Sequence, residues 1–173
     1  NQYILIKGEK ASASRGVGKT LNDYLDEWNP DSLRYALASI LPEQNDSEIS
    51  EDEMIRRNNE ELVAAWGNLV QRVFSQYINN FENLKFDFEL NDVDRKIIDE
   101  ANVCFEKTSE LIEKVELKSS LQSVMGYVNK INAYLNETEP WKVIKEDITR
   151  ATAILYTSLT AIEAVSYTHL TLP

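Results

Sequence analysis

The spacing of apolar residues predicts that most of this chain is helical. From about residue 50 onward, an apolar side chain recurs every three or four positions, which lines one face of an α-helix. Ser50 and Glu53 have the spacing of a capping box at the start of this region. The pattern predicts helices over about residues 50–77, 92–115, 117–136 and 142–164. Because the connections between them are short and polar, we expect these helices to pack antiparallel as a bundle.

The residues before position 50 have a different pattern. The apolar run at residues 3–6 is typical of a strand, and no later segment offers it a partner strand. Two short helices are expected next, one over residues 21–28 and one from Asn29-Pro30 to about Pro42, with proline at the first helical position. A lone strand needs a sheet, and the chain starts with Asn1 rather than Met, so we expect a piece of a longer protein.

The last nine residues look foreign to the rest of the chain. Residues 165–173 interrupt the helical pattern with β-branched side chains and resemble the translation of a transposon-end sequencing adapter. We therefore predict a non-native tail, and we leave His169, the single histidine, out of the functional argument.

Charge and composition narrow the function classes. A net charge of -11 argues against binding nucleic acid mainly through counterion release, so no DNA partner is expected. RNA recognition by a few stacking and hydrogen-bonding side chains stays open. No segment is long enough to cross a membrane and no signal peptide opens the chain, while the single cysteine, Cys104, lies at a core position of an expected helix. We expect a cytoplasmic protein without a metal site.

One loop has the chemistry of a phosphate site. Residues 8–16, here called the Lys10 loop, combine Lys10 with Ser12, Ser14 and glycines, which supply a cation, hydroxyls and free backbone amides. Residues 13–20 also resemble a loose P-loop with alanine at its first glycine position. A P-loop needs a second apolar strand that ends in aspartate, and the helical remainder of the chain does not offer one.

Three further side chains have the chemistry to recognise an unpaired base. Asn68 and Arg72 lie about 40° apart on an ideal helix, on the side away from the apolar stripe that contains Trp66. An amide beside a guanidinium can read a base edge. Trp141 follows Pro140, which fixes the backbone before it, so its indole either stacks on a base or packs in the core.

These segments together resemble one family. The Lys10 loop resembles the Lys-Met-Ser-Lys-Ser signature of class I aminoacyl-tRNA synthetases. Residues 31–37, 56–63, 67–72 and 139–142 then follow in the order found in methionyl-tRNA synthetases. The loop departs from the signature because Ala11 replaces methionine and Ala13 replaces the second lysine, so Arg15 or Lys19 would have to substitute for that lysine.

The resemblance assigns roles to these residues. It implies that Lys10, Ser12 and Ser14 are catalytic and contact ATP together with Arg15, and that Asn68, Arg72 and Trp141 bind the anticodon. The implied fold class is all-α: an antiparallel, anticodon-binding helix bundle over residues 50–164. A strand-loop remnant of an α/β catalytic domain would precede it over residues 1–49, and residues 165–173 would form the non-native tail.

The resemblance also implies the activity of the whole enzyme, a methionine-tRNA ligase. That enzyme would activate methionine with ATP and Mg²⁺ and transfer it to tRNA(Met). The present chain would bind no cofactor by itself and would be inactive alone. Two alternatives stay open: another class I synthetase, such as a cysteinyl, leucyl, isoleucyl or valyl enzyme, or a helical interaction module without enzymatic activity.

Overall fold

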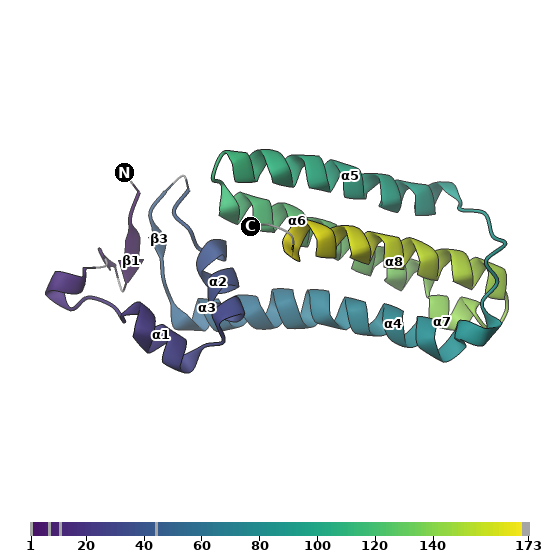
Figure 1. Ribbon diagram of the computed structural model, residues 1–173, viewed down its shortest axis with the longest axis horizontal. Coiled ribbons are helices and arrows are strands. Elements are labelled where there is room, and N and C mark those ends of the chain that lie inside the picture. Colours follow the sequence, from purple (N-terminus) through teal and green to yellow (C-terminus); the bar gives the residue numbers. More distant parts are fainter. Residues whose placement is uncertain (1, 7, 11, 44, 171–173) are drawn as a thin grey trace.

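The computed structural model describes residues 2–6, 8–10, 12–43 and 45–170, without the side chains of residues 13 and 167–170. The sequence predictions about Ala11, about the side chains of Ala13 and His169, and about the last three residues therefore lie outside the described part. The molecule is elongated, with a small unit of short strands and helices at one end and long helices over the rest (Figure 1).

Long antiparallel helices form a bundle, as predicted (Figure 1). They are α4 (Asn68–Asn80), α5 (Asp92–Glu113), α6 (Leu117–Thr138) and α8 (Ile148–Leu170), with the short α7 (Pro140–Val143) between α6 and α8. Their apolar stripes meet in one core that includes Leu69, Val73, Val128, Ile131, Leu135, Ile154 and Leu155. Burial of these side chains is the main stabilising contribution.

The N-terminal unit contains a small three-stranded sheet. Strand β1 (Ile4–Ile6) lies between β2 (Glu9–Lys10), which is antiparallel to it, and β3 (Ser47–Glu48), which is parallel. The prediction that the first strand has no partner later in the chain was therefore wrong. Both partner strands are two residues long and polar, which is too short for an alternating pattern to reveal.

Three helices complete the N-terminal unit: α1 (Leu21–Glu27), α2 (Pro30–Ser39) and α3 (Glu51–Arg57). They form a second, smaller core of Leu33, Ala36, Ile40 and Met54. Helix α1 begins with a capping box of Thr20 and Asp23, and α2 begins at Pro30 with Asn29 as its cap. The short 3-10 helix η1 (Ala13–Arg15) lies in the Lys10 loop.

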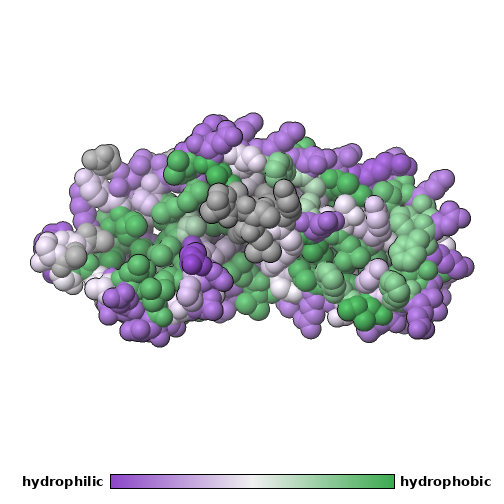
Figure 2. Space-filling model, viewed as in Figure 1, coloured by the Kyte–Doolittle hydropathy of each residue, from purple (hydrophilic) through white to green (hydrophobic). Residues whose placement is uncertain are grey.

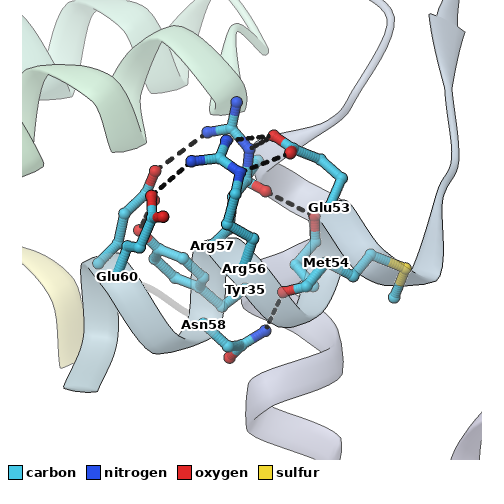
Figure 3. A network of polar contacts seen from close by, with 10 residues as sticks. Tyr35, Glu53, Met54, Arg56, Arg57, Asn58 and Glu60 are labelled. Atoms are coloured by element: carbon cyan, nitrogen blue, oxygen red, sulfur yellow. Dashed lines mark hydrogen bonds and ion pairs between the residues drawn. The ribbon is translucent and has the colours of Figure 1, made fainter. Parts of the chain in front are cut away.

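The helix predicted over residues 50–77 is continuous but changes its hydrogen-bond spacing. After α3, the ten residues of η2 (Asn58–Gly67) form a π-helix, and α4 follows without a break. The predicted capping box at its start was wrong, because the Ser50 side chain makes no cap bond. The carboxylate of Glu53 instead accepts hydrogen bonds from Arg56 and Arg57 (Figure 3).

The C-terminal part differs from the prediction at two points. The helix expected over residues 142–164 is divided into α7 and α8, with a turn between them. The expected interruption at residue 165 was wrong, since α8 continues to Leu170 and Val165 is buried in the bundle core. Packing against the core offsets the low helix propensity of β-branched residues. The foreign origin of residues 165–173 stays a prediction.

A long-range contact joins the N-terminal unit to the bundle. The carboxylate of Glu43 accepts hydrogen bonds from the backbone N–H groups of Lys118 and Ser119, and from the Ser119 hydroxyl at 2.6 Å. Those N–H groups lie in the first turn of α6, where no helical partner is available and the helix dipole favours a negative charge. Glu43 thus caps a helix 75 residues further along the chain.

Tyr35 and Asn58 add a second junction near α3. The Tyr35 hydroxyl, on α2, donates to the carboxylate of Glu61, which also accepts from Arg57 at 3.1 Å. The amide of Asn58 donates to the Ser32 carbonyl oxygen at 3.2 Å and also to the Met54 carbonyl oxygen (Figure 3). Polar contacts therefore join α2 to the start of η2, beside the small core in which Met54 of α3 packs against α2.

Candidate functional site

Three elements of the bundle meet around Arg72. The guanidinium carbon of Arg72, on α4, lies 5.0 Å from the centre of the Trp141 ring, on α7, in a cation–π arrangement. Its Nη2 atom donates a hydrogen bond of 2.9 Å to Oδ1 of Asn136, on α6. The structure therefore brings two of the three predicted base-recognition residues into direct contact, although they are far apart in the sequence.

Trp141 is held at a fixed point of the surface. Pro140 is buried at the first position of α7, and Glu139 before it adopts a left-handed backbone with φ of 42°. Non-glycine residues rarely adopt that conformation, so the turn into α7 is constrained by its surroundings. The indole is half-buried. It is thus neither sealed in the core nor free to move, whereas Trp66 packs against the bundle core as predicted.

Asn68 lies one helical turn before Arg72 and is exposed. It is the first residue of α4, directly after the π-helix. Asn136 completes this group, which we call the α4–α7 cluster: Asn68, Arg72, Asn136 and Trp141. Sequence reasoning missed Asn136, because a single exposed asparagine on α6 has no pattern that distinguishes it from a solvated residue.

The Lys10 loop lies at the opposite end of the molecule from α7 (Figure 1). It folds back on itself through paired backbone hydrogen bonds between Ser12 and Val17, of 3.2 and 3.0 Å. The side-chain oxygens of Ser12 and Ser14 lie 3.2 Å apart, and the Arg15 guanidinium donates to the Lys10 carbonyl oxygen at 3.3 Å. These contacts hold the loop that contains the four residues predicted to contact ATP in one compact conformation.

Lys10 and Lys19, two cations of this region, differ in the groups that surround them. The Lys10 ammonium lies 3.4 Å from the centre of the Tyr3 ring and is exposed. The Lys19 ammonium is 2.7 Å from carboxylate oxygens of both Glu27 and Glu51. Hydrogen bonds to these two carboxylates raise the pKa of Lys19 and so keep its ammonium group charged and paired. Lys19 is thus paired with two carboxylates, whereas the Arg15 side chain is exposed.

The P-loop alternative finds no support. A cavity of about 760 Å³ lies between the Lys10 loop and the start of α3, lined in part by Gly18, Lys19 and Glu51. A P-loop lysine would point at phosphates, but Lys19 is engaged by two carboxylates. Among the described residues, the strand that follows the loop, β3, is two residues long and ends in Glu48 rather than in aspartate.

Metal and thiol chemistry are not indicated in the described part of the chain. No group of three or more histidine, cysteine, aspartate or glutamate side chains there is arranged to hold a metal ion. Cys104 is half-buried against the bundle core, and burial raises the pKa of its thiol. None of the helices over residues 2–170 that the structure describes has the length and hydropathy needed to cross a membrane.

Two family models match this chain. Residues 1–74 match the family described as tRNA synthetases class I (M), and residues 87–173 match the anticodon binding domain of methionyl tRNA ligase. These matches and the fold define a class I aminoacyl-tRNA synthetase. Within that class, the chain belongs to the methionyl-tRNA synthetase family.

Two individual relatives are methionine–tRNA ligases. A methionine–tRNA ligase from Chloroflexus aggregans is 38% identical over 165 residues, which cover 95% of this chain and 28% of the relative. One from Corynebacterium glutamicum is 37% identical and is covered over 26% of its length. The chain therefore spans little more than a quarter of the curated relatives that it matches.

A solved structure shares the fold. Mycobacterium tuberculosis methionyl-tRNA synthetase, in complex with methionyl-adenylate, superposes with a TM-score of 0.85 and 22% identity. The superposition covers 96% of this chain and 34% of that one. The family assignment excludes the interaction module without an enzymatic parent and favours the methionyl enzyme over the other class I synthetases.

Proposed function

We propose that the whole protein is a methionine-tRNA ligase, which activates methionine with ATP and transfers it to tRNA(Met), and that this chain supplies two of its parts. One part is the ATP-contacting Lys10 loop and the other is the anticodon-reading bundle. The contact between Arg72 and Trp141 is the observation that carries the second assignment. We propose the domain division that the sequence predicts: residues 1–49 belong to the catalytic domain, residues 50–164 form the anticodon-binding domain and residues 165–173 are a tail. We also propose a cytoplasmic location.

The anticodon would be read by the α4–α7 cluster. An unpaired base would stack on the accessible part of the Trp141 indole, a contact worth about 1–3 kcal/mol. Asn68 offers an amide with both donors and an acceptor, and Arg72 offers a planar set of donors beside the indole. Because this recognition depends on a few directed contacts, it is compatible with the net charge of -11.

The Lys10 loop would act on ATP. The ammonium of Lys10, the hydroxyls of Ser12 and Ser14 and the guanidinium of Arg15 all lie on one exposed loop, and all can donate to phosphate oxygens. Donors that are placed in advance stabilise the charge that develops on pyrophosphate as methionine is adenylated. Mg²⁺ would enter with ATP. The described residues offer no separate metal site.

A binding experiment tests the anticodon role. Parent chain and Trp141→Ala are titrated with a methionine anticodon stem-loop and with a stem-loop of scrambled anticodon. Loss of one stacked base predicts about 5- to 150-fold weaker binding of the methionine stem-loop by Trp141→Ala. Phe86→Ala, at an aromatic residue that is 60% exposed, is the matched control and should bind like the parent. Equal affinities of parent and Trp141→Ala would contradict the assignment.

A further inference from the structure

We propose that Asn132 is a positioning residue for anticodon recognition, and that it acts through the junction where the π-helix η2 becomes α4. The proposal rests on the anticodon role proposed above for Asn68, Arg72 and Trp141. Asn132 itself would not contact RNA. It would determine the direction in which Asn68 and Arg72 leave the helix.

The junction lies directly before the recognition residues. The backbone N–H of Asn68 donates to the Val63 carbonyl oxygen, five residues earlier, which is the spacing of a π-helix. The next residues belong to α4 and use the spacing of four. A helix advances by a different angle per residue on the two sides of such a change. The place where the change occurs therefore sets the directions of both Asn68 and Arg72.

Asn132 holds this junction from the neighbouring helix. Its amide, on α6, donates to the carbonyl oxygen of Ala65 at 3.0 Å and also to that of Val128, on its own helix, at 3.2 Å. Ala65 lies in the last turn of η2, only three residues before Asn68. The bond therefore ties the backbone of the π-helix to α6.

Helix α6 also holds the side chain of Arg72, the second recognition residue after the junction. Asn136, one turn after Asn132 on α6, accepts the hydrogen bond from Arg72. Helix α6 thus makes hydrogen bonds at two successive points of the helix formed by η2 and α4. One is to the backbone of Ala65 and the other is from the Arg72 guanidinium. If the bond at Ala65 is lost, only the bond at Arg72 remains of these two polar contacts, and the apolar packing of α4 does not fix where the π-helix ends.

Gly67 provides independent evidence that the backbone is closely packed at the junction. A Cβ atom added there would lie 3.2 Å from the carbonyl oxygen of Leu62, closer than side chains normally approach a backbone oxygen. The backbone of Gly67 is ordinary right-handed helix, so the residue is not needed for an unusual φ angle. Its lack of a side chain instead permits the close approach within the π-helix.

The experiment measures discrimination rather than affinity alone. Parent, Asn132→Ala and Asn129→Ala are titrated with the methionine anticodon stem-loop and with the scrambled one, and folding is followed by circular dichroism and thermal melting. Asn129 is the matched control, an exposed asparagine three residues earlier on α6. We expect Asn132→Ala to lower the ratio of the two affinities about tenfold, as for the loss of one directed contact, and Asn129→Ala to retain it.

The ratio separates positioning from a purely structural role. Partial unfolding would weaken binding of both stem-loops equally and leave the ratio unchanged, so an unchanged ratio for Asn132→Ala would overturn the proposal. If Asn132→Ala does not fold, the Gly67→Ala variant is measured in its place. Alanine stabilises an ordinary helix relative to glycine. At this position, however, its Cβ atom would crowd the Leu62 carbonyl oxygen and disturb the junction. A lower ratio in folded Gly67→Ala supports the proposal, and an unchanged ratio overturns it. A parent that fails to discriminate would overturn the proposed anticodon role itself, together with this inference.

Discussion

At the scale of single residues, a buried ion pair links the first turn of α5 to the first turn of α8. Asp94 is fully buried and accepts two hydrogen bonds from the Arg150 guanidinium, one of them at 2.9 Å, and one from the Tyr134 hydroxyl at 2.6 Å. Its carboxylate also completes the capping box of α5 with Asn91. One carboxylate therefore joins α5, α6 and α8, although only its capping role can be inferred from the local sequence.

Removal of this charge should be costly. We predict that Asp94→Asn lowers the free energy of unfolding by about 3–5 kcal/mol, because Arg150 keeps its charge without a full partner. Urea unfolding followed by circular dichroism measures the change. Asp92→Asn, two residues earlier and exposed, is the control and should change stability by less than about 0.5 kcal/mol. A loss no larger than that of the control would show that the pair contributes little.

The same group predicts part of the acid sensitivity. Burial raises the pKa of Asp94, but the hydrogen bonds from Arg150 and Tyr134 outweigh this and hold the pKa below its ordinary value. A carboxylate with a depressed pKa in the folded state contributes stability above the unfolded pKa, about 4, and this contribution is lost as the pH falls. Unfolding curves of the parent should therefore lose stability below about pH 4. The stability difference between parent and Asp94→Asn should shrink over the same range, and a constant difference would refute the linkage.

At the scale of elements, the contact between Glu43 and α6 can be tested by itself. We predict that Glu43→Ala destabilises the chain by about 1–2 kcal/mol, since it leaves the first-turn N–H groups of α6 without their acceptor. Thermal and urea unfolding give the value. Glu113→Ala, at an exposed glutamate near the end of α5, should have a much smaller effect. Equal effects of the two substitutions would mean that the contact adds no stability.

The helices could be predicted from the sequence because each has a long apolar stripe. The apolar stripes of α5, α6 and α8 continue for five or six turns, which is too long for the spacing to arise by chance. The strands β2 and β3 have two residues each, and their pairing depends on the tertiary position of β1. The π-helix was not predictable either, because its residues have no sequence pattern that separates it from an α-helix, and its contact with Asn132 comes from a distant part of the chain.

The candidate site was predictable only in part, for a similar reason. Trp141 and Arg72 have distinctive chemistry and positions, and the structure brings them together. Asn136 and Asn132 have ordinary chemistry, and their importance comes from the partners that face them across the bundle. Lys19 shows the opposite case, since a lysine in a glycine-rich stretch suggests a phosphate site until Glu27 and Glu51 are seen beside it.

At the scale of the whole molecule, two functional regions are separated by the length of the bundle. The Lys10 loop and α7 lie at opposite ends, and the long helix from α3 through η2 to α4 runs between them (Figure 1). Hydrophilic side chains cover much of the outer edge formed by α5, while apolar side chains are visible over the N-terminal unit and between the helices (Figure 2). Because the net charge of the chain is -11, we do not expect its overall field to guide RNA to the bundle.

The charge distribution predicts how RNA binding responds to salt. With a net charge of -11, the chain repels phosphates at long range, and binding at the α4–α7 cluster must rely on stacking and a few directed donors. Each phosphate that a cation neutralises on a single strand adds about 0.7 to the slope of log affinity against log salt. With Arg72 as the cation of the cluster, we predict a slope no steeper than about -2 for the methionine anticodon stem-loop, measured between low and physiological salt. The Arg72→Gln variant should flatten it further. A slope near -5 would require about seven phosphate contacts, and recognition would then depend on a cationic surface rather than on the indole and amides of the cluster.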